Sequence, residues 1–400
     1  MRVGIPGFVP ERLTEARAAR RVASKSGLAR LLGMNPSTVG RWEDGTSAPD
    51  EAAWTALANV LNVRREFFLR PVFVSPRPLF YRSLSSTLVR DLDYQRAQMR
   101  WLHELSSVLQ HYVDFPSVDI PDVLGGASYK QLRDEDIERI ALDLRRHWCI
   151  GEGPCSDVVS LLERIGVVVS TIEMGTSKLD GLCSWSASEG RPHILLATDK
   201  MSFPRRQMDA AHELAHAVLH WDVSEEDLKR DLKNIETQAF RLASAFLMPS
   251  TTYPHEVPRA SLAALLAAKE RWRVSIKAQI KRLSDLDVIP PEHATDLYKL
   301  YSAKGWNREE PLDREWPIPE PRNLADALNA IVDGGVRTKA DLLAVEFTTS
   351  PGDIESLANL PGGWFASRTG QVVQLKRDAG RADERPMAGG GVVLPFNRRP

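Results

Sequence analysis

Cysteine is scarce in this sequence, and long apolar runs are absent from it. The three cysteines, Cys149, Cys155 and Cys183, are too few and too irregularly spaced for a disulfide framework. No stretch reaches the roughly 18 consecutive apolar residues that indicate a membrane-spanning helix, and residues 1–10 lack the apolar core of a signal peptide. We therefore expect a cytoplasmic protein that does not enter a membrane.

The net charge is also small, because 52 basic residues face 53 acidic ones. The distribution is less even, since residues 1–77 hold twelve basic and seven acidic residues, a local surplus of +5. A small domain with that surplus suits the phosphate backbone of a nucleic acid. The solvated face of a helical domain would give the same surplus, so the charge alone leaves both interpretations open.

Turn-rich segments divide the chain into five expected parts: a helical N-terminal domain (1–70), a helical connector (71–125), a larger domain (126–310), a helical C-terminal domain (311–375) and a Gly-, Arg- and Pro-rich tail (376–400), expected to be disordered. The connector is predicted to hold one long helix or two abutting helices between 84 and 113. In the larger domain we expect strands at 167–172, 181–185 and 193–197, followed by helices near 205–221 and 234–247. The predicted fold class is mainly α and multidomain, with one small sheet.

Two short helices in the N-terminal domain are marked by their end residues. Ser24 is a suitable N-cap for a helix that runs to Leu32, and Gly33 permits the tight turn after it. Asn35 and Pro36 then open a second helix, because a proline in the first turn lacks an N–H that would be unpaired anyway. The pattern predicts a helix-turn-helix.

This segment resembles the phage-repressor (XRE-type) helix-turn-helix. The matching pieces are Leu28-Ala29, Leu32-Gly33, Ser37-Thr38-Val39, Trp42-Glu43-Asp44-Gly45 and Pro49, with Leu57-Ala58 and Leu61 in the following helix. The resemblance implies that the second helix enters the major groove of DNA. Lys25, Ser37, Thr38 and Arg41 are the candidate DNA-contacting residues, and Arg41 could read a guanine edge. The alternative is a protein-interaction bundle without DNA affinity.

The centre of the sequence carries a His-Glu-x-x-His motif at residues 212–216. Histidines four residues apart lie on one face of a helix, so His212 and His216 can direct ring nitrogens at one metal ion. Glu213 lies beside them and can act as general base towards a metal-activated water. Glu236, on a following helix, is the candidate third ligand, provided that a turn near Trp221 and Asp222 folds this helix back.

The segments Glu236-Thr237-Gln238-Ala239 and Phe246-Leu247-Met248-Pro249, together with the motif itself and Leu219-His220, resemble the ImmA/IrrE family of metallo-endopeptidases. The resemblance covers about 130–310 and implies a zincin-like α+β fold with a small sheet. It implies His212, His216 and Glu236 as ligands, Glu213 as general base, and an extended substrate along one edge of the sheet. His220 and His193 are two further candidates for positions close to the ligands, although a purely structural role is an alternative for each.

The sequence thus predicts a DNA-binding regulatory metallo-endopeptidase that cleaves a protein substrate, expected to be a transcriptional repressor. One divalent ion is implied, with Zn²⁺ expected and Mn²⁺ as the alternative, since two imidazoles and a carboxylate suit several ions. A homodimer is left open. Two other functions remain: a transcription regulator whose peptidase-like domain senses a ligand or partner without turnover, and a component of a toxin–antitoxin or stress module.

Overall fold

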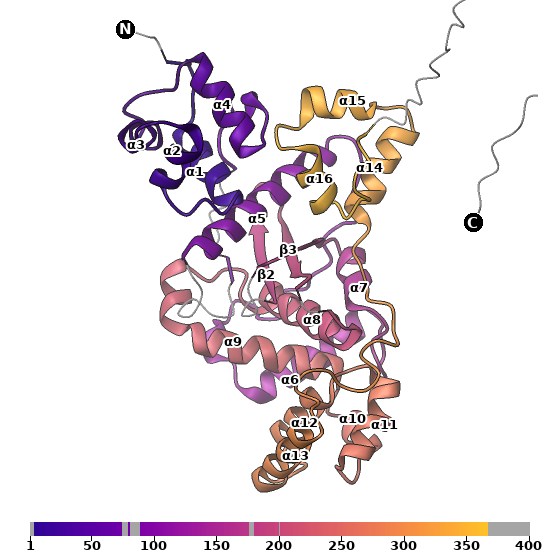
Figure 1. Ribbon diagram of the computed structural model, residues 1–400. Helices are drawn as coiled ribbons and strands as arrows, with labels where there is room; N and C mark the ends of the chain where they lie inside the picture. The colour runs from indigo at the N-terminus through magenta and orange to yellow at the C-terminus, as the bar shows by residue number, and fades with distance from the viewer. Residues whose placement is uncertain (1–3, 74–78, 81–88, 176–179, 200, 367–400) are drawn as a thin grey trace, which may run out of the picture. The chain divides into compact units, whose positions relative to one another are not determined.

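The computed structural model describes residues 4–73, 79–80, 89–175, 180–199 and 201–366. The predicted disordered tail at 376–400 lies outside these residues. Within them the fold is mainly α with one small sheet (Figure 1). No helix in these ranges is both long and apolar enough to cross a membrane.

The N-terminal helices end where the capping residues predict. Helix α2 spans Lys25–Leu32, with the Ser24 side chain accepting from the backbone of Gly27 and with Gly33 in the left-handed region. Helix α3 spans Pro36–Glu43, and its N-cap is Asn35. The bounds of the other helices in this part are α1 Pro10–Ala19, α4 Glu51–Leu61, the 3₁₀ turn η1 Arg65–Leu69 and α5 Val89–Leu109. The predicted connector helix is therefore a single helix, and the part of the prediction at 84–88 lies outside the described residues.

The sheet has three strands, β1 (Val168–Ile172), β2 (Gly181–Ser186) and β3 (Arg191–Ala197), in the order β1-β3-β2. Strands β2 and β3 form an antiparallel hairpin, whereas β1 runs parallel to β3. The two remaining edges belong to β1 and β2. All three strands lie within two residues of their predicted bounds. β-branched residues dominate β1, and apolar residues dominate β3.

Helices follow the sheet for most of the remaining chain. The helices after the sheet are α8 Phe203–Leu219, α9 Glu225–Leu247, α10 Tyr253–Glu256, α11 Leu262–Trp272, α12 Ile276–Asp285, α13 Pro291–Ala303, α14 Asn323–Asp333, α15 Lys339–Asp341, a π-helical turn η3 Leu342–Glu346 and α16 Pro351–Leu357. The elements between α5 and the sheet are the 3₁₀ turn η2 Tyr129–Gln131 and the helices α6 Asp134–His147 and α7 Val158–Arg164. The acidic residues 225–227 indicate a helix start, and α9 does begin at Glu225, where Ser224 caps it; the helix predicted near 234–247 is the C-terminal half of α9.

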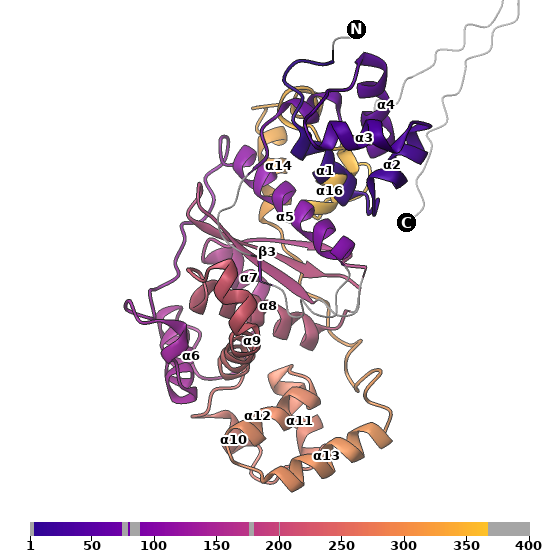
Figure 2. The same ribbon diagram turned by 90° about the vertical axis from the view of Figure 1, so that its left-hand side faces the viewer.

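The sheet separates two apolar cores, because successive residues of a strand point to opposite faces. On β3, Ile194 and Leu196 belong to the core that contains α7, α8 and α9. Leu195, between them, belongs to the core that contains α1–α5, α14, η3 and α16. Figure 2 shows the sheet with α7 and α8 on one side and α5 on the other.

The N-terminal helices share contacts with the C-terminal ones. Arg20 pairs with Asp353 at 2.6 Å, and Val63 forms an isolated antiparallel bridge with Thr349. Arg64 donates to backbone carbonyls of η3, among them that of Ala344 at 2.9 Å. Residues from both ends of the sequence therefore complete one core.

A pair of buried histidines lies between α5 and β3. The rings of His103 and His193 stack with centroids 4.0 Å apart, and both side chains are fully buried. Burial lowers the pKa of His103 to about 2, with the neighbouring His193 as a smaller cause. Neither ring nitrogen of His103 has a hydrogen-bond partner among the described residues. The folded chain therefore keeps His103 neutral in mild acid.

We expect His103→Phe to make the fold less sensitive to acid. A histidine with a depressed pKa takes up its proton on unfolding once the pH falls below its ordinary value near 6.5, so stability is lost from there downward. The loss is about 1.4 kcal/mol per pH unit for one such group. Urea unfolding at pH 7.5 and 5.5 should show a smaller decrease for His103→Phe than for the wild type. The exposed His111, replaced in the same way, is the control; equal decreases for both variants would contradict the assignment.

Candidate functional site

Two antiparallel helices build the candidate metal centre. Helix α8 carries His212 and His216 one turn apart, and the turn at 220–224 reverses the chain into α9. Helices α8 and α9 pack along their length through small and apolar residues of the same core. This hairpin brings Glu236, from the middle of α9, against the two imidazoles.

The three side chains converge on one point. The Nε2 atoms of His212 and His216 are 3.1 Å apart, and the Glu236 carboxylate lies 3.4 Å from the first and 3.3 Å from the second. Ligands that surround a tetrahedral ion at about 2.0–2.1 Å are themselves separated by about 3.3 Å. The two imidazole nitrogens lie at about this spacing from each other and each from one carboxylate oxygen, Oε2 of Glu236 for His212 and Oε1 for His216, so the three side chains can surround one ion.

The electrostatics of Glu236 also fit a cation. Its exposed fraction is 9%. Neither oxygen of its carboxylate accepts a hydrogen bond of normal geometry from another described residue. Burial alone would raise the pKa of Glu236, but contacts with His212 and His216 offset this and hold the pKa below its ordinary value. A buried carboxylate that stays ionised beside two imidazoles needs a compensating positive charge. A divalent ion bound by this donor set would supply it.

Glu213 lies on the same helix, turned towards the sheet. It is buried, and its carboxylate packs against Gly181 at the start of β2. A Cβ atom added at Gly181 would come within 2.6 Å of Glu213 Oε1. Because residue 181 is glycine and has no Cβ atom, the Glu213 carboxylate fits at this position.

A chain of hydrogen-bonding groups extends behind His216. Its Nδ1 lies 3.1 Å from Nδ1 of His220, and Nε2 of His220 lies 3.1 Å from Oε1 of Gln238. The amide nitrogen of Gln238 donates to the backbone carbonyl of Tyr129 at 2.7 Å. All of these side chains are buried, so water does not compete with the contacts.

This chain selects the tautomer of His216. Because the Tyr129 carbonyl accepts from the Gln238 amide nitrogen, the amide oxygen faces His220 and accepts the proton of its Nε2. Burial lowers the pKa of His220 to about 3, with His216 as the next cause, so its Nδ1 carries a lone pair. That lone pair accepts the Nδ1 proton of His216, which leaves Nε2 of His216 unprotonated and directed at the candidate metal position.

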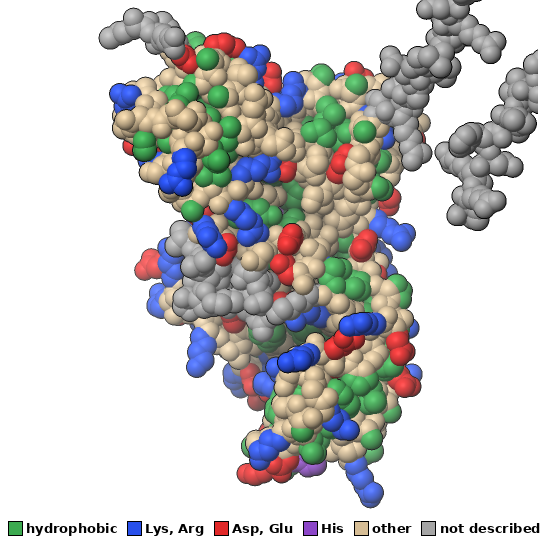
Figure 3. Space-filling model, viewed as in Figure 1, with side chains coloured by type: hydrophobic (Ala, Val, Ile, Leu, Met, Phe, Trp, Pro, Cys, Tyr) green, Lys and Arg blue, Asp and Glu red, His purple; other side chains and the backbone are tan. Residues whose placement is uncertain are grey.

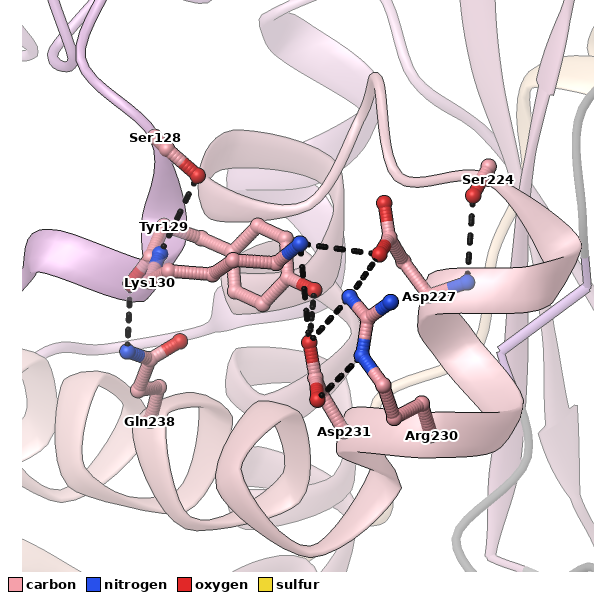
Figure 4. Close-up of polar contacts among 8 residues, drawn as sticks. All are labelled: Ser128, Tyr129, Lys130, Ser224, Asp227, Arg230, Asp231 and Gln238. Carbon is pink, nitrogen blue, oxygen red and sulfur yellow. Dashed lines mark hydrogen bonds and ion pairs between the residues drawn. The ribbon is translucent and has the colours of Figure 1, made fainter.

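A surface network fixes the turn that carries Tyr129. The Tyr129 hydroxyl donates to Asp231 at 2.8 Å, and Lys130 pairs with Asp227 at 2.8 Å. Figure 4 shows Arg230 and Tyr129 converging on Asp231, with Gln238 bonded to the turn from below. Helix α9 thus positions η2, and η2 in turn orients Gln238.

Replacement of Gln238 by leucine is expected to weaken metal binding by up to about tenfold, at the low end of the 10–100-fold that loss of a direct partner of a ligand costs, because Gln238 acts through His220. Leucine keeps the volume but cannot accept from His220, so the tautomer of His216 is no longer fixed. Competition with a chromogenic chelator measures the affinity. Thr237→Val, at the exposed neighbouring position, is the matched control; unchanged affinity in Gln238→Leu would contradict the role.

The structure brings some predicted residues together and separates others. His220 lies next to His216, as the sequence leads us to expect. The expected place of His193 near the ligands is corrected: it faces α5, where its Nε2 lies 3.4 Å from Glu189. Its neighbour Ile194 faces the α8 side of β3, and a side chain at 193 must therefore point the opposite way.

Four residues at the centre were not found by reasoning from the sequence: Gln238, Tyr129, Gly181 and Phe80. Gln238 carried a usable signal, since it lies two residues after Glu236 on a helix whose buried face it shares. Phe240 also packs on the centre, with its ring centroid 4.2 Å from that of His212. Tyr129 contributes its backbone carbonyl, which every residue type has, so the sequence gives no signal for this role.

The candidate DNA-contacting residues lie on or beside α3. Ser37 and Arg41 are exposed one turn apart, while Thr38 is half-buried. Ser37 Oγ donates to Asn35 at 2.9 Å. Lys25 already pairs with Asp44 at 2.5 Å, although both side chains are exposed and such a pair is weak.

Much of the positive charge of this domain is used within the protein. Arg12, Arg17 and Arg20 each pair with a carboxylate, and Arg64 and Arg70 donate to carbonyls of the C-terminal region. The face in Figure 3 shows Lys and Arg side chains scattered among acidic ones rather than gathered in one patch. Of the described basic residues before position 71, Arg30 and Arg41 are exposed and make no ion pair with other described residues.

Comparison with known families agrees with this geometry. Residues 162–284 match a peptidase family described as the IrrE N-terminal-like domain, and residues 11–66 match a helix-turn-helix domain. The comparison with curated proteins gave no match. The chain therefore contains a metallopeptidase-like domain of the IrrE type and an N-terminal helix-turn-helix, which confirms both resemblances seen in the sequence.

Proposed function

We propose that this protein is a DNA-binding regulatory metallo-endopeptidase whose substrate is a transcriptional repressor. The observation that supports it most is the convergence of His212, His216 and Glu236 on one point, beside Glu213, inside the segment matched by the IrrE-type family. We propose these three as ligands of one divalent ion, Zn²⁺ before Mn²⁺. Glu213 is proposed as the general base.

A bound ion would polarise the scissile carbonyl and lower the pKa of an attacking water. Glu213 takes the proton from that water and delivers it to the leaving amine. Burial beside Gly181 holds its carboxylate in place and keeps bulk water away from it. His220 and Gln238 keep the proton of His216 on the nitrogen that faces away from the ligand point.

The helix-turn-helix directs this activity to DNA, or to a repressor bound there, and we place the protein in the cytoplasm on that account. Incubation of the metal-loaded protein with any transcriptional repressor encoded in the same operon tests the proposal. Mass spectrometry should find one new pair of termini, absent when a chelator is added. An intact repressor in both samples would refute cleavage of that substrate.

The proposed DNA contact predicts the effect of Arg41→Ala. If the Arg41 guanidinium reads a base pair, its loss should cost about 1–3 kcal/mol at that position and relax the sequence preference there. Binding to a panel of single-base operator variants measures this. Arg65→Ala is the control, since Arg65 is also exposed but pairs with Glu51 on α4. An equal loss of affinity for every sequence would instead make Arg41 a phosphate contact.

A further inference from the structure

The outer edge of β2 lies beside the candidate metal centre. Because the strand order is β1-β3-β2, β2 pairs with β3 on one side only. Gly181, Cys183 and Trp185 alternate along the face of β2 that meets α8: Gly181 contacts Glu213, and the Trp185 indole donates to Ala217 at 3.1 Å. A peptide that paired with this edge would therefore run past the general base.

One residue of the chain itself already pairs there. The backbone N–H of Phe80 donates to the carbonyl of Cys183 at 3.2 Å, and the two residues form an isolated antiparallel bridge. Cross-strand partners point to the same face of a sheet, so Phe80 and Cys183 share the face that meets α8. Phe80 thus takes the backbone position of an added strand.

The side chain of Phe80 fills a site against the candidate ligands. Its ring stacks on His216 with centroids 4.9 Å apart and an angle of 13° between the planes. It also lies 6.0 Å from the His220 ring. Only 3% of Phe80 is exposed. The space beside His216 therefore encloses the flat ring of Phe80, and a smaller side chain at position 80 would leave part of that space empty.

Peptides that add to a sheet edge gain affinity from backbone hydrogen bonds and specificity from pockets for alternate side chains. Phe80 shows both kinds of contact at the one edge that adjoins Glu213. We propose that Phe80 occupies, in cis, a substrate subsite for an aromatic side chain, and that an extended peptide with an aromatic residue must displace it. This inference rests on the proposed peptidase function and names the residue class that the substrate presents.

The test uses a fluorescent peptide with the sequence of residues 76–84, which contains Phe80, added to the full-length zinc-loaded protein. In the wild type the intact chain competes for the subsite, whereas in Phe80→Ala the subsite is vacant. We expect the peptide to bind Phe80→Ala at least about tenfold more tightly, the effect of burying one large apolar side chain. The same peptide with alanine in place of its phenylalanine should lose this gain.

Further variants guard against a failure of Phe80→Ala to fold. Phe80→Leu keeps most of the apolar volume and should bind the peptide with intermediate affinity, while Phe80→Tyr should match the wild type. Phe73→Ala is the matched control, because Phe73 contacts His103 on the other side of the sheet. Equal peptide binding by the wild type and by whichever of the Ala and Leu variants folds would overturn the proposal.

With Glu213→Gln added to every variant, anisotropy measures binding without hydrolysis, so this test is independent of turnover. Tight binding of the peptide by Phe80→Ala, when the protein with Glu213 intact cleaves nothing, would support the subsite and refute the peptidase function. Repressor cleavage, together with peptide binding that does not depend on Phe80, would refute the subsite alone.

Discussion

Glu213→Gln is expected to lower peptide-bond cleavage by about 10²–10⁴-fold, the usual contribution of a general base. Glutamine keeps the size and the position against Gly181 but cannot take a proton from water. Metal content should remain unchanged, because the proposed ligands are His212, His216 and Glu236. Cleavage rates and metal analysis on the same preparation measure both quantities.

The transcriptional response of cells that carry Glu213→Gln distinguishes a peptidase from a regulator that only senses a ligand. A regulator that senses a ligand without turnover would keep its transcriptional response in Glu213→Gln, since neither its metal nor its DNA-binding helix is altered. A normal response would lead us to abandon proteolysis as the main activity. Loss of the response with metal retained is the result that the peptidase requires.

His216→Ala is expected to reduce metal affinity by more than about 100-fold, beyond the cost of changing a partner behind a ligand. The change removes one of three donors and also the ring on which Phe80 stacks. It leaves the carboxylate of Glu236 buried with one imidazole, so the apo-protein should be less stable too. Chelator competition and thermal unfolding with and without zinc measure these effects.

His147→Ala is the control for that variant, since His147 is exposed and bonds to Asp119 away from the centre. Its metal affinity should equal that of the wild type. Should His216→Ala bind zinc as tightly as this control, His216 would not be a ligand. The contrast with Glu213→Gln then distinguishes a residue that holds the metal from one that moves a proton.

Local signals were sufficient to predict several elements from the sequence. Ser24, Gly33, Asn35 and Pro36 defined the ends of α2 and α3, because each acts on the backbone of its own turn. Strand β1 was found because a run of β-branched residues seldom favours a helix, whereas β2 and β3 carry few such residues and were predicted as short segments between turns. The pair of histidines four apart needed only the periodicity of a helix.

Other features depended on contacts between distant segments. The alternation of β3 predicts that His193 and Ile194 point to opposite faces, but not which face meets α8. Helix α9 begins at Glu225 because Ser224 caps it, although the residues after this cap are mostly charged and give a weak apolar pattern. The proposed division at positions 70, 125, 310 and 375 stays a prediction, and the core shared by both ends of the chain makes limited proteolysis its natural test.

The pairing of the N-terminal arginines limits how the helix-turn-helix can hold DNA. Each cation that neutralises a phosphate releases about 0.9 of a condensed counterion from B-DNA. With Arg30 and Arg41 exposed and unpaired among the described residues, and Lys25 in a weak surface pair, one copy would release about two or three. Non-specific affinity for DNA would then be low, and between 50 and 200 mM salt it would fall about 10- to 40-fold, far less than the roughly 10³–10⁵-fold of a protein with six to ten phosphate contacts. A chain of this kind spends little time on random sequence, and it would find its site through base contacts or through a protein already bound there.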